Sequence, residues 1–242
     1  DIPQAQKDLL MALKKTGKPI VVVLFTGRPL TISWEHDNMD AILNVWFPGS
    51  EAGYSIADAL FGDVNPSGKL SATWPQNVGQ IPIFYAHKNT GRPLPEGQWF
   101  QKFRSNYLDV SNEPEFPFGF GLSYSNFEYS DLKLSATSLK GNQTLTASVT
   151  VKNTGKYSGK EVVQLYIRDV VGSVTRPVKE LKGFQKIELK PGESKEVKFA
   201  ITPEDLKFYN YDLNHVWEAG DFDIMIGTNS AAVKTKRVNW AK

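Results

Sequence analysis

The chain has no cysteine, only three histidines and three methionines, and no long apolar run. Without cysteine there are no disulfides, no thiolate nucleophile and no zinc site with sulfur ligands. The absence of cysteine does not by itself identify the cellular compartment. The longest apolar run, Ile20 to Phe25, is far shorter than the roughly 20 residues that cross a bilayer. We therefore expect no membrane insertion.

A strong charge of either sign is also absent. The 28 basic and 26 acidic residues leave a net charge of +2, and no basic run stands out. Because nucleic-acid binding depends on a basic patch or stripe, we expect no nucleic-acid partner.

Aromatic residues, by contrast, are abundant, at 12% of the chain with six Trp and nine Tyr. Such a content suits a protein that binds flat-faced ligands such as sugars, or a large apolar core, and the core is the favoured interpretation. The chain starts with DIPQAQKDLL, without an initiator Met or a signal peptide, and we expect it to be cut from a longer protein.

Residues 1–85 have the pattern of an α/β fold. Leu9, Leu10 and Leu13 lie on one face of a predicted N-terminal helix. The unbroken apolar stretch of residues 20–25 predicts a strand that is buried on both faces in a parallel sheet.

A second strand, a second helix and a third strand are expected next. The second strand is predicted within residues 41–49. The helix after it has Ser50 as N-cap, Glu51 in its first turn and Gly62 as its end, and residues 65–75 form a turn and a strand. Only two strands have the character of central strands, whereas a doubly wound sheet needs five or six. We therefore expect a partial α/β sandwich, an incomplete, mainly parallel sheet with flanking helices.

Residues 129–242 change to the alternating pattern of β-strands. Leu145, Ala147, Val149 and Val151 point to one face and polar residues to the other, and the pattern recurs further along the chain. About seven short strands with turns between them and no helix predict an all-β, immunoglobulin-like sandwich. The absence of a cysteine pair favours the fibronectin type III-like variety.

The middle segment, residues 86–128, is predicted to be irregular. A loop of this length is usually functional, unless it is tied down on a neighbouring domain. Its last part, PEFPFGFGLSYSNF (residues 114–127), is the aromatic seam of the chain. A flexible linker would not contain so many aromatic residues, so we expect a rigid seam packed between the two domains. The expected packing residues are Phe116, Phe118, Phe120, Tyr124 and Phe127.

Several kinds of site are excluded because the chain lacks the motifs that they require. Gly119 and Gly121 lack the third glycine of a dinucleotide-binding loop, and no Gly-x-Ser-x-Gly motif is present. His36, His87 and His215 lie far apart in the sequence, and each is predicted to be an ordinary loop residue. We expect neither a metal nor a cofactor.

Paired carboxylates are the remaining catalytic candidates, because a glycosidase needs two of them on either side of its sugar. Glu51 suits a helix N-terminus by its charge and Asp63 suits a turn, so each has a structural explanation. No convincing pair stands out, and we predict no catalytic residue in the chain. The candidates weighed are Glu35, Asp37, Asp40, Glu51, Asp63, Glu96 and Asp109.

The motifs KPIVVVLFTGRPL, GDVNPSGKL, FPFGFGLSY and RPVKELKGFQKIELKPGES together resemble the C-terminal part of glycoside hydrolase family 3. The resemblance runs in order through essentially the whole chain and is closest to the bacterial periplasmic β-glucosidases. It implies a retaining β-glucosidase with a barrel, an α/β sandwich and a fibronectin type III-like domain.

The family's catalytic residues are not expected in this chain. The resemblance implies an Asp nucleophile in the barrel and a Glu acid/base in a loop just before the segment that matches DIPQAQKDLL. The chain alone is therefore expected to be inactive. Its expected partners are the barrel domain of the same protein and, through that barrel, a β-glucoside or oligosaccharide. The family implies a periplasmic or secreted protein, and a homodimer is compatible with it.

The loop of residues 87–109 is the part expected to reach the active-site mouth. Trp99 and Phe100 are candidate stacking platforms for a sugar of the substrate, and Arg92 and Arg104 are candidate hydrogen-bond donors. The alternative is that these residues only anchor the loop. Many relatives have Arg where this chain has Asn106, which weakens the assignment of Arg104.

Two other classes of function remain open. The chain could be a stand-alone carbohydrate-binding module, or a structural module based on its fibronectin-like half. A gene that encodes a barrel with a catalytic Asp upstream of Asp1 would exclude both.

Overall fold

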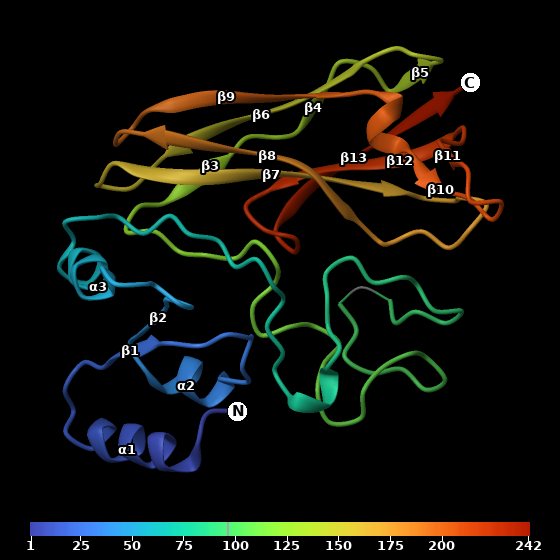
Figure 1. Ribbon diagram of the computed structural model, residues 1–242. Coiled ribbons are helices and arrows are strands. Elements are labelled where there is room, and N and C mark those ends of the chain that lie inside the picture. The colour runs from blue at the N-terminus through green and yellow to red at the C-terminus, as the bar shows by residue number, and fades with distance from the viewer. Residues whose placement is uncertain (96) are drawn as a thin grey trace.

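The computed structural model describes residues 1–95 and 97–242, and shows an α/β part and an irregular segment beside each other beneath a β-sandwich (Figure 1). This order confirms the predicted fold class, while the domain limits at residues 85 and 128 remain predictions. Among the described residues, no helix is long and apolar enough to cross a membrane. The α/β part contains helices α1 (Gln4–Lys14), α2 (Ser33–Asn38) and α3 (Ala52–Phe61), the 3-10 helix η1 (Val78–Gln80), and strands β1 (Val21–Leu24) and β2 (Ala41–Asn44).

The sheet of the α/β part consists of two parallel strands, β1 and β2, with Val21 opposite Ala41 and Leu24 opposite Asn44. The parallel pairing confirms the prediction. The prediction of burial on both faces is wrong, because Val21 and Phe25 are exposed and Leu24 is the only buried residue of β1. A two-stranded sheet has no central strand, so each strand keeps an open edge.

Helix α1 forms as predicted, but its apolar face is not packed. Leu9 and Leu13 are exposed, Leu10 is half-buried, and no residue of α1 is buried. Lys7 attaches α1 to α2, with Nζ lying 3.8 Å from Glu35 Oε1. The amphipathic pattern thus predicted the helix correctly, and the structure leaves most of its apolar face open to solvent.

Two helix predictions need correction. Helix α2 (residues 33–38) was not predicted at all. Helix α3 begins at Ala52 with Glu51 as its N-cap, so Ser50 is not the cap and Glu51 is not in the first turn. Gly62 ends α3 as predicted, in the left-handed conformation (φ +88°) that glycine adopts without steric cost.

Residues 65–75 form no strand, contrary to prediction. Trp74 makes a single antiparallel bridge with Phe116 of the seam, in which the Trp74 N–H donates to the Phe116 carbonyl at 2.9 Å. The Glu115 N–H donates to the Trp74 carbonyl at the same distance. The stretch therefore pairs with the seam through an isolated bridge and does not join a sheet.

The sandwich consists of two sheets. The five-stranded sheet has the order β5-β13-β12-β7-β8, and in the other sheet β3, β4 and β9 each pair with β6. A short pair, β10 and β11, and the 3-10 helix η2 (Pro203–Leu206) lie at one end. The strands are β3 (Phe127–Tyr129), β4 (Lys133–Leu134), β5 (Ser138–Lys140), β6 (Leu145–Asn153), β7 (Gly159–Asp169), β8 (Glu180–Leu189), β9 (Ser194–Ile201), β10 (Phe208–Tyr209), β11 (His215–Val216), β12 (Gly220–Gly227) and β13 (Val233–Ala241).

The core of the sandwich lies between the two sheets, as the alternation predicts. Leu145, Ala147, Val149 and Val151 of β6 are all fully buried. They belong to one apolar cluster with residues of both sheets, including Trp240 of β13. Burial of side chains of this size stabilises a fold by roughly 1.5–3 kcal/mol each.

The second face of β7 is buried as well, which the alternating pattern does not predict. The Tyr166 hydroxyl donates to Gln164 Oε1 at 2.5 Å, and Gln164 Nε2 donates to the Gly119 carbonyl at 3.1 Å. Burial, with Tyr85 nearby, raises the pKa of Tyr166 above its usual range. Strand β7 is therefore covered by the core on one face and by the seam on the other.

The seam is hydrogen-bonded to both parts of the molecule. The Leu70 N–H donates to the Phe120 carbonyl, and the Gly119 N–H donates to the Leu70 carbonyl, each at 2.7 Å. On the other side, the Ser230 N–H of the sandwich donates to the Phe118 carbonyl at 2.9 Å. These bonds fix the seam between the two parts, as predicted.

The aromatic rings of the seam pack unevenly. The ring pairs, with their centroid distances, are Phe116–Phe120 (5.2 Å), Phe116–Trp74 (6.4 Å) and Phe118–Tyr85 (4.4 Å). Tyr124 is exposed, contrary to the expectation of a packed ring, and its hydroxyl donates to the Ala59 carbonyl at 2.6 Å. Tyr124 thus contributes a hydrogen bond to the seam and little buried area.

A buried ion pair also joins the two parts. Lys69 Nζ lies 3.1 Å from Glu161 Oε2, with the two side chains only 12% and 4% exposed. Glu161 Oε1 accepts from the hydroxyls of Tyr129 (2.9 Å) and Thr228 (2.7 Å), and Lys69 donates to the Gly121 carbonyl (2.9 Å). Burial and the neighbouring Glu161 raise the pKa of Tyr129 well above its usual range. The charges are therefore both paired and hydrogen-bonded, as buried charges must be.

The Lys69→Met variant tests this ion pair. We expect the free energy of unfolding to fall by about 3 kcal/mol, because the Glu161 charge stays buried without its partner. Chemical denaturation measures the change. The matched control is Lys160→Gln, which breaks an exposed 3.9 Å pair with Glu188 and costs about 1 kcal/mol or less. Equal losses in the two variants would contradict the joining role of Lys69.

A second stability test concerns Gly119, whose φ is +80°. A Cβ at this position would lie 2.1 Å from Gln164 Oε1, whereas a Cβ at Gly192, with φ +78°, would have nothing within 4 Å. Alanine at either site loses about 1–2 kcal/mol through its left-handed backbone. We expect Gly119→Ala to lose roughly 1–3 kcal/mol more than Gly192→Ala, through overpacking of the seam. Denaturation curves that coincide for the two variants would contradict close packing between the seam and Gln164.

Candidate functional site

The loop of residues 86–112 is anchored at its start on the connection between β7 and β8. Lys88 and Pro177 form an isolated antiparallel bridge, and the Val178 N–H donates to the His87 carbonyl at 2.9 Å. The rest of the loop extends below the sandwich and beside the α/β part (Figure 1). A loop held in this way positions its side chains on a rigid base.

Two segments of the loop meet at a single bridge, which brings Arg92 and Arg104 close along the backbone. Pro93 and Ser105, the residues that follow them, form a parallel bridge. The Ser105 N–H donates to the Arg92 carbonyl at 2.9 Å, and the Thr90 and Ser105 hydroxyls share a 2.7 Å hydrogen bond. Both arginines are exposed, and a hydrogen-bonded backbone thus presents two guanidinium groups to solvent.

Trp99 and Phe100 lie at the outer part of the loop, 52% and 47% exposed. Among the described residues, neither ring contacts another aromatic ring or a cation. Their faces are therefore open to a ligand, although sugar binding by these residues remains a prediction. Glu96, a carboxylate candidate of the same loop, lies outside the described residues.

The C-terminal end of the loop is held by Gln80, a residue that the sequence analysis did not identify. Its side chain is fully buried, and Nε2 donates to the carbonyls of Ser111 (2.9 Å) and Glu113 (3.0 Å). Asn106 makes a local hydrogen bond to the Tyr107 carbonyl at 3.1 Å. The Asn106 side chain thus braces its own stretch of backbone.

The carboxylate candidates that the structure describes are scattered. Glu35 alone is buried, with Lys7 at 3.8 Å and no hydrogen bond to either carboxylate oxygen within the described ranges. Asp40 accepts from the Ile20 N–H at 2.7 Å, a structural role that links α2 to β1. The exposed candidates are Asp37, Asp40, Glu51, Asp63 and Asp109.

Ser33, His36 and Glu115 form a cluster that sequence reasoning missed. Ser33 Oγ donates to Glu115 Oε2 at 2.6 Å, and His36 Nδ1 lies 2.5 Å from Glu115 Oε1. Both contacts end on the carboxylate. A nucleophilic serine needs its hydroxyl bonded to the base, so the order Ser–Glu–His does not make a catalytic triad. The cluster instead ties α2 to the start of the seam.

The histidines correct one further expectation. His36 lies on α2 and His215 in strand β11, so only His87 is a loop residue. Within the part of the chain that the structure describes, no group of three or more His, Asp or Glu residues is placed to hold a metal ion.

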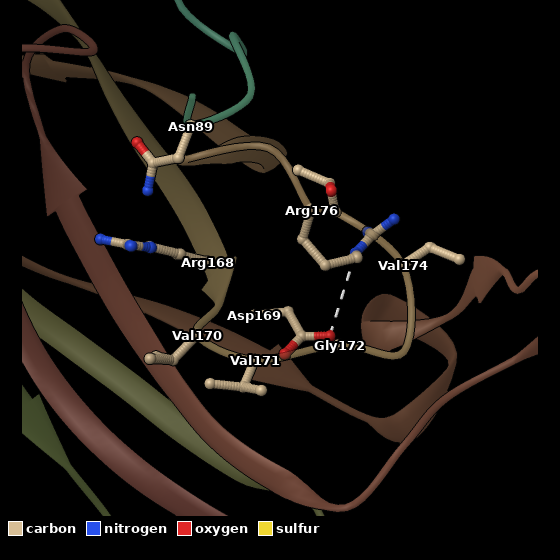
Figure 2. Close-up of a pocket in the computed structure, with 9 residues that line it drawn as sticks. Asn89, Arg168, Asp169, Val170, Val171, Gly172, Val174 and Arg176 are labelled. Carbon is tan, nitrogen blue, oxygen red and sulfur yellow. Dashed lines mark ion pairs between the residues drawn. The ribbon is translucent and has the colours of Figure 1, made fainter. Parts of the chain in front are cut away.

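A pocket of about 230 Å³ lies at the base of the loop (Figure 2). In this view Asn89 of the loop and Arg168 of β7 lie on one side, and Asp169 and Arg176 lie on the other. Arg176 Nε is 3.9 Å from Asp169 Oδ2, which is an ion pair too long for a hydrogen bond. Three valines, Thr175 and Gly172 complete the lining. The sequence did not predict this site, because no motif marks the stretch of residues 168–176 that lines most of it, and Asn89 joins it only in the folded chain.

A larger hollow of about 660 Å³ lies at the carboxyl end of β1, where Phe25, Thr26 and Arg28 line it together with residues around Pro3. Thr26 Oγ1 donates to the Arg28 carbonyl at 2.7 Å and holds this turn. The carboxyl ends of parallel strands are the common place for ligands in open α/β sheets.

Two family profiles match the chain. The glycosyl hydrolase family 3 C-terminal domain matches residues 1–124, and a fibronectin type III-like domain matches residues 161–230. The first covers more than half of the chain and includes the loop described above.

Individual relatives are similar over almost the entire chain. A periplasmic β-glucosidase of Salmonella typhimurium is 53% identical over 96% of this chain and 30% of its own length. A β-xylosidase of Formosa agariphila is 45% identical over 99% of this chain and 32% of its own length. The crystal structure of a β-glucosidase from Listeria innocua in complex with glucose covers 99% of this chain, with 33% of its own length, at 45% identity and a TM-score of 0.93. The chain thus spans about a third of the length of these relatives.

Proposed function

Because the chain belongs to glycoside hydrolase family 3, we propose that it is the C-terminal part of a retaining β-glucosidase that hydrolyses terminal β-linked glucosyl residues. The observation that carries the proposal is the likeness, over 99% of the chain, to a β-glucosidase solved with glucose. The β-xylosidase relatives make xylosides the competing class of substrate.

We assign the catalytic carboxylates to residues outside this chain, with the nucleophile in a barrel domain of the same protein. The scatter of the described carboxylates supports this assignment, because an acid and a nucleophile or base must flank one glycosidic bond. Exposed apolar residues of the α/β part support contact with a further domain, since such patches mark interaction surfaces. They include Phe25, Phe47, Tyr54 and Phe61.

Hydrolysis of aryl glycosides tests the proposal directly. We expect the full-length enzyme to cleave an aryl β-glucoside with a higher kcat/KM than the matching β-xyloside. The chain of 242 residues alone should cleave neither, because both catalytic carboxylates are assigned to residues outside it. Turnover by the chain alone, above a heat-inactivated control, would place catalysis within it. Tight binding of cellobiose to the chain alone, measured by calorimetry, would favour a carbohydrate-binding module.

The loop is proposed to supply contacts on the aglycone side of the substrate. Trp99 and Phe100 offer apolar faces to a sugar ring, and Arg92 and Arg104 offer donors to its hydroxyls. The anchoring of the loop on β7 and β8 supports this role, because it limits the entropy that is lost when substrate binds.

The Trp99→Ala variant of the full-length enzyme tests the loop. We expect kcat/KM for cellobiose to fall about fivefold to tenfold, mainly through KM, because a stacking contact of roughly 1 kcal/mol is lost. Phe184→Ala, which removes another exposed aromatic ring from β8, should leave both constants unchanged. The loop would have only an anchoring role if the two variants behaved alike.

We further propose that the protein acts in the periplasm or outside the cell. The relative from Salmonella typhimurium that bears the name periplasmic β-glucosidase supports this location. The association of two copies into a homodimer remains a prediction.

A further inference from the structure

The pocket at the base of the loop contains two buried polar atoms that form an ion pair with each other but no hydrogen bond among the described residues. Asp169 is 8% exposed, and among the described residues its Oδ2 accepts no hydrogen bond. Arg176 Nε, on a side chain that is 13% exposed, likewise donates none. Buried polar groups in native proteins nearly always have a partner, so a polar molecule is expected between these atoms.

The wall formed by Arg176 is rigid. Its Nη2 donates to Glu180 Oε2 at 2.6 Å, and its guanidinium lies 4.2 Å from the centroid of the Phe208 ring. Gly172 leaves the space open, because a Cβ there would lie 2.8 Å from the Arg176 side chain and 3.2 Å from Asp169 Oδ2. Any larger residue at position 172 would crowd the side chains of Arg176 and Asp169.

The opposite wall supplies free donors. Arg168 is half-buried and, among the residues that the structure describes, its guanidinium makes no hydrogen bond or ion pair. Asn89 is exposed at the start of the loop, and its side chain lies beside Arg168 in Figure 2. The pocket thus combines one carboxylate acceptor with two guanidinium groups and one amide.

The charges favour a neutral ligand. Arg176 is balanced by Glu180, and the negative Asp169 lies close to the positive Arg168 in sequence and in the pocket. A phosphate or carboxylate would have to approach Asp169. Burial raises the pKa of Asp169, against the opposing effect of Arg176, so this carboxylate gains from a hydroxyl that donates to it.

We propose that this pocket binds a neutral monosaccharide, with Asp169 accepting from its hydroxyls and Arg168, Arg176 and Asn89 donating to them. A volume of about 230 Å³ is smaller than the 300–1,000 Å³ typical of pockets for larger ligands, which suits one sugar unit. The site goes beyond the proposed glucosidase activity, because it lies on the sandwich. A sugar held there links the loop to β7 and fixes the base of the loop.

Binding of glucose to the intact protein tests the proposal, with inorganic phosphate as the anionic probe. Crystals soaked in glucose should show the sugar between Asp169 and Arg168. In NMR titrations that follow the backbone amide of Gly172 in the pocket, Arg168→Gln should weaken this binding tenfold or more, the effect of losing a charged hydrogen bond. Asn89→Ala, on the exposed loop, provides a second variant with little risk to folding. Lys195→Gln, an exposed lysine on β9 in the other sheet, is the control and should bind glucose like the wild type.

The possible results separate clearly. Sugar density in the pocket, together with weaker binding in Arg168→Gln and Asn89→Ala, supports the proposal. Tighter binding of phosphate than of glucose at this site would overturn the choice of ligand class. An empty pocket in soaked crystals, or equal glucose binding in Arg168→Gln and Lys195→Gln, would overturn the site itself. None of these readouts depends on hydrolysis. A failure of the proposed glucosidase activity can therefore be distinguished from a failure of the proposed sugar site.

Discussion

The buried polar side chains of β7 are the constraint on which the arrangement of the molecule depends. Glu161 and Gln164 are almost fully buried, and a buried carboxylate or amide needs hydrogen-bond partners. Lys69 of the α/β part supplies the partner of Glu161, and Gly119 of the seam supplies that of Gln164. The sandwich therefore holds the α/β part and the seam in one position, because any other position would cost Glu161 its charged partner and Gln164 its bond to the seam.

This constraint extends from the seam to the loop. The loop begins beside Tyr85, whose ring stacks on Phe118 of the seam, and is bridged to the sandwich at Pro177. Trp99 and Phe100 are exposed at its outer part. The sandwich thus has a function in the proposed enzyme without containing a catalytic residue, because it is the support on which substrate contacts are positioned.

The pocket at the base of the loop adds a proposed sugar site to the place where the loop meets β7. Asp169 and Arg168 stand at the end of β7, and Asn89 belongs to the loop, so a ligand between them contacts both. The contact between the loop and β7 that positions the loop is therefore also the place where a bound sugar would connect the two.

Local patterns in the sequence were sufficient to predict the two apolar faces of the sandwich core, the parallel pair β1 and β2, the end of α3 at Gly62 and the packed seam. Each follows from neighbouring residues, through alternation, glycine conformation or aromatic content. Tertiary structure alone decided the burial of Gln164 and Tyr166, the cluster around Glu115 and the pocket at Asp169. Contacts such as Gln164 with Gly119 join residues that are far apart along the chain. They leave no periodic pattern, because each polar group finds its partner only after the chain has folded.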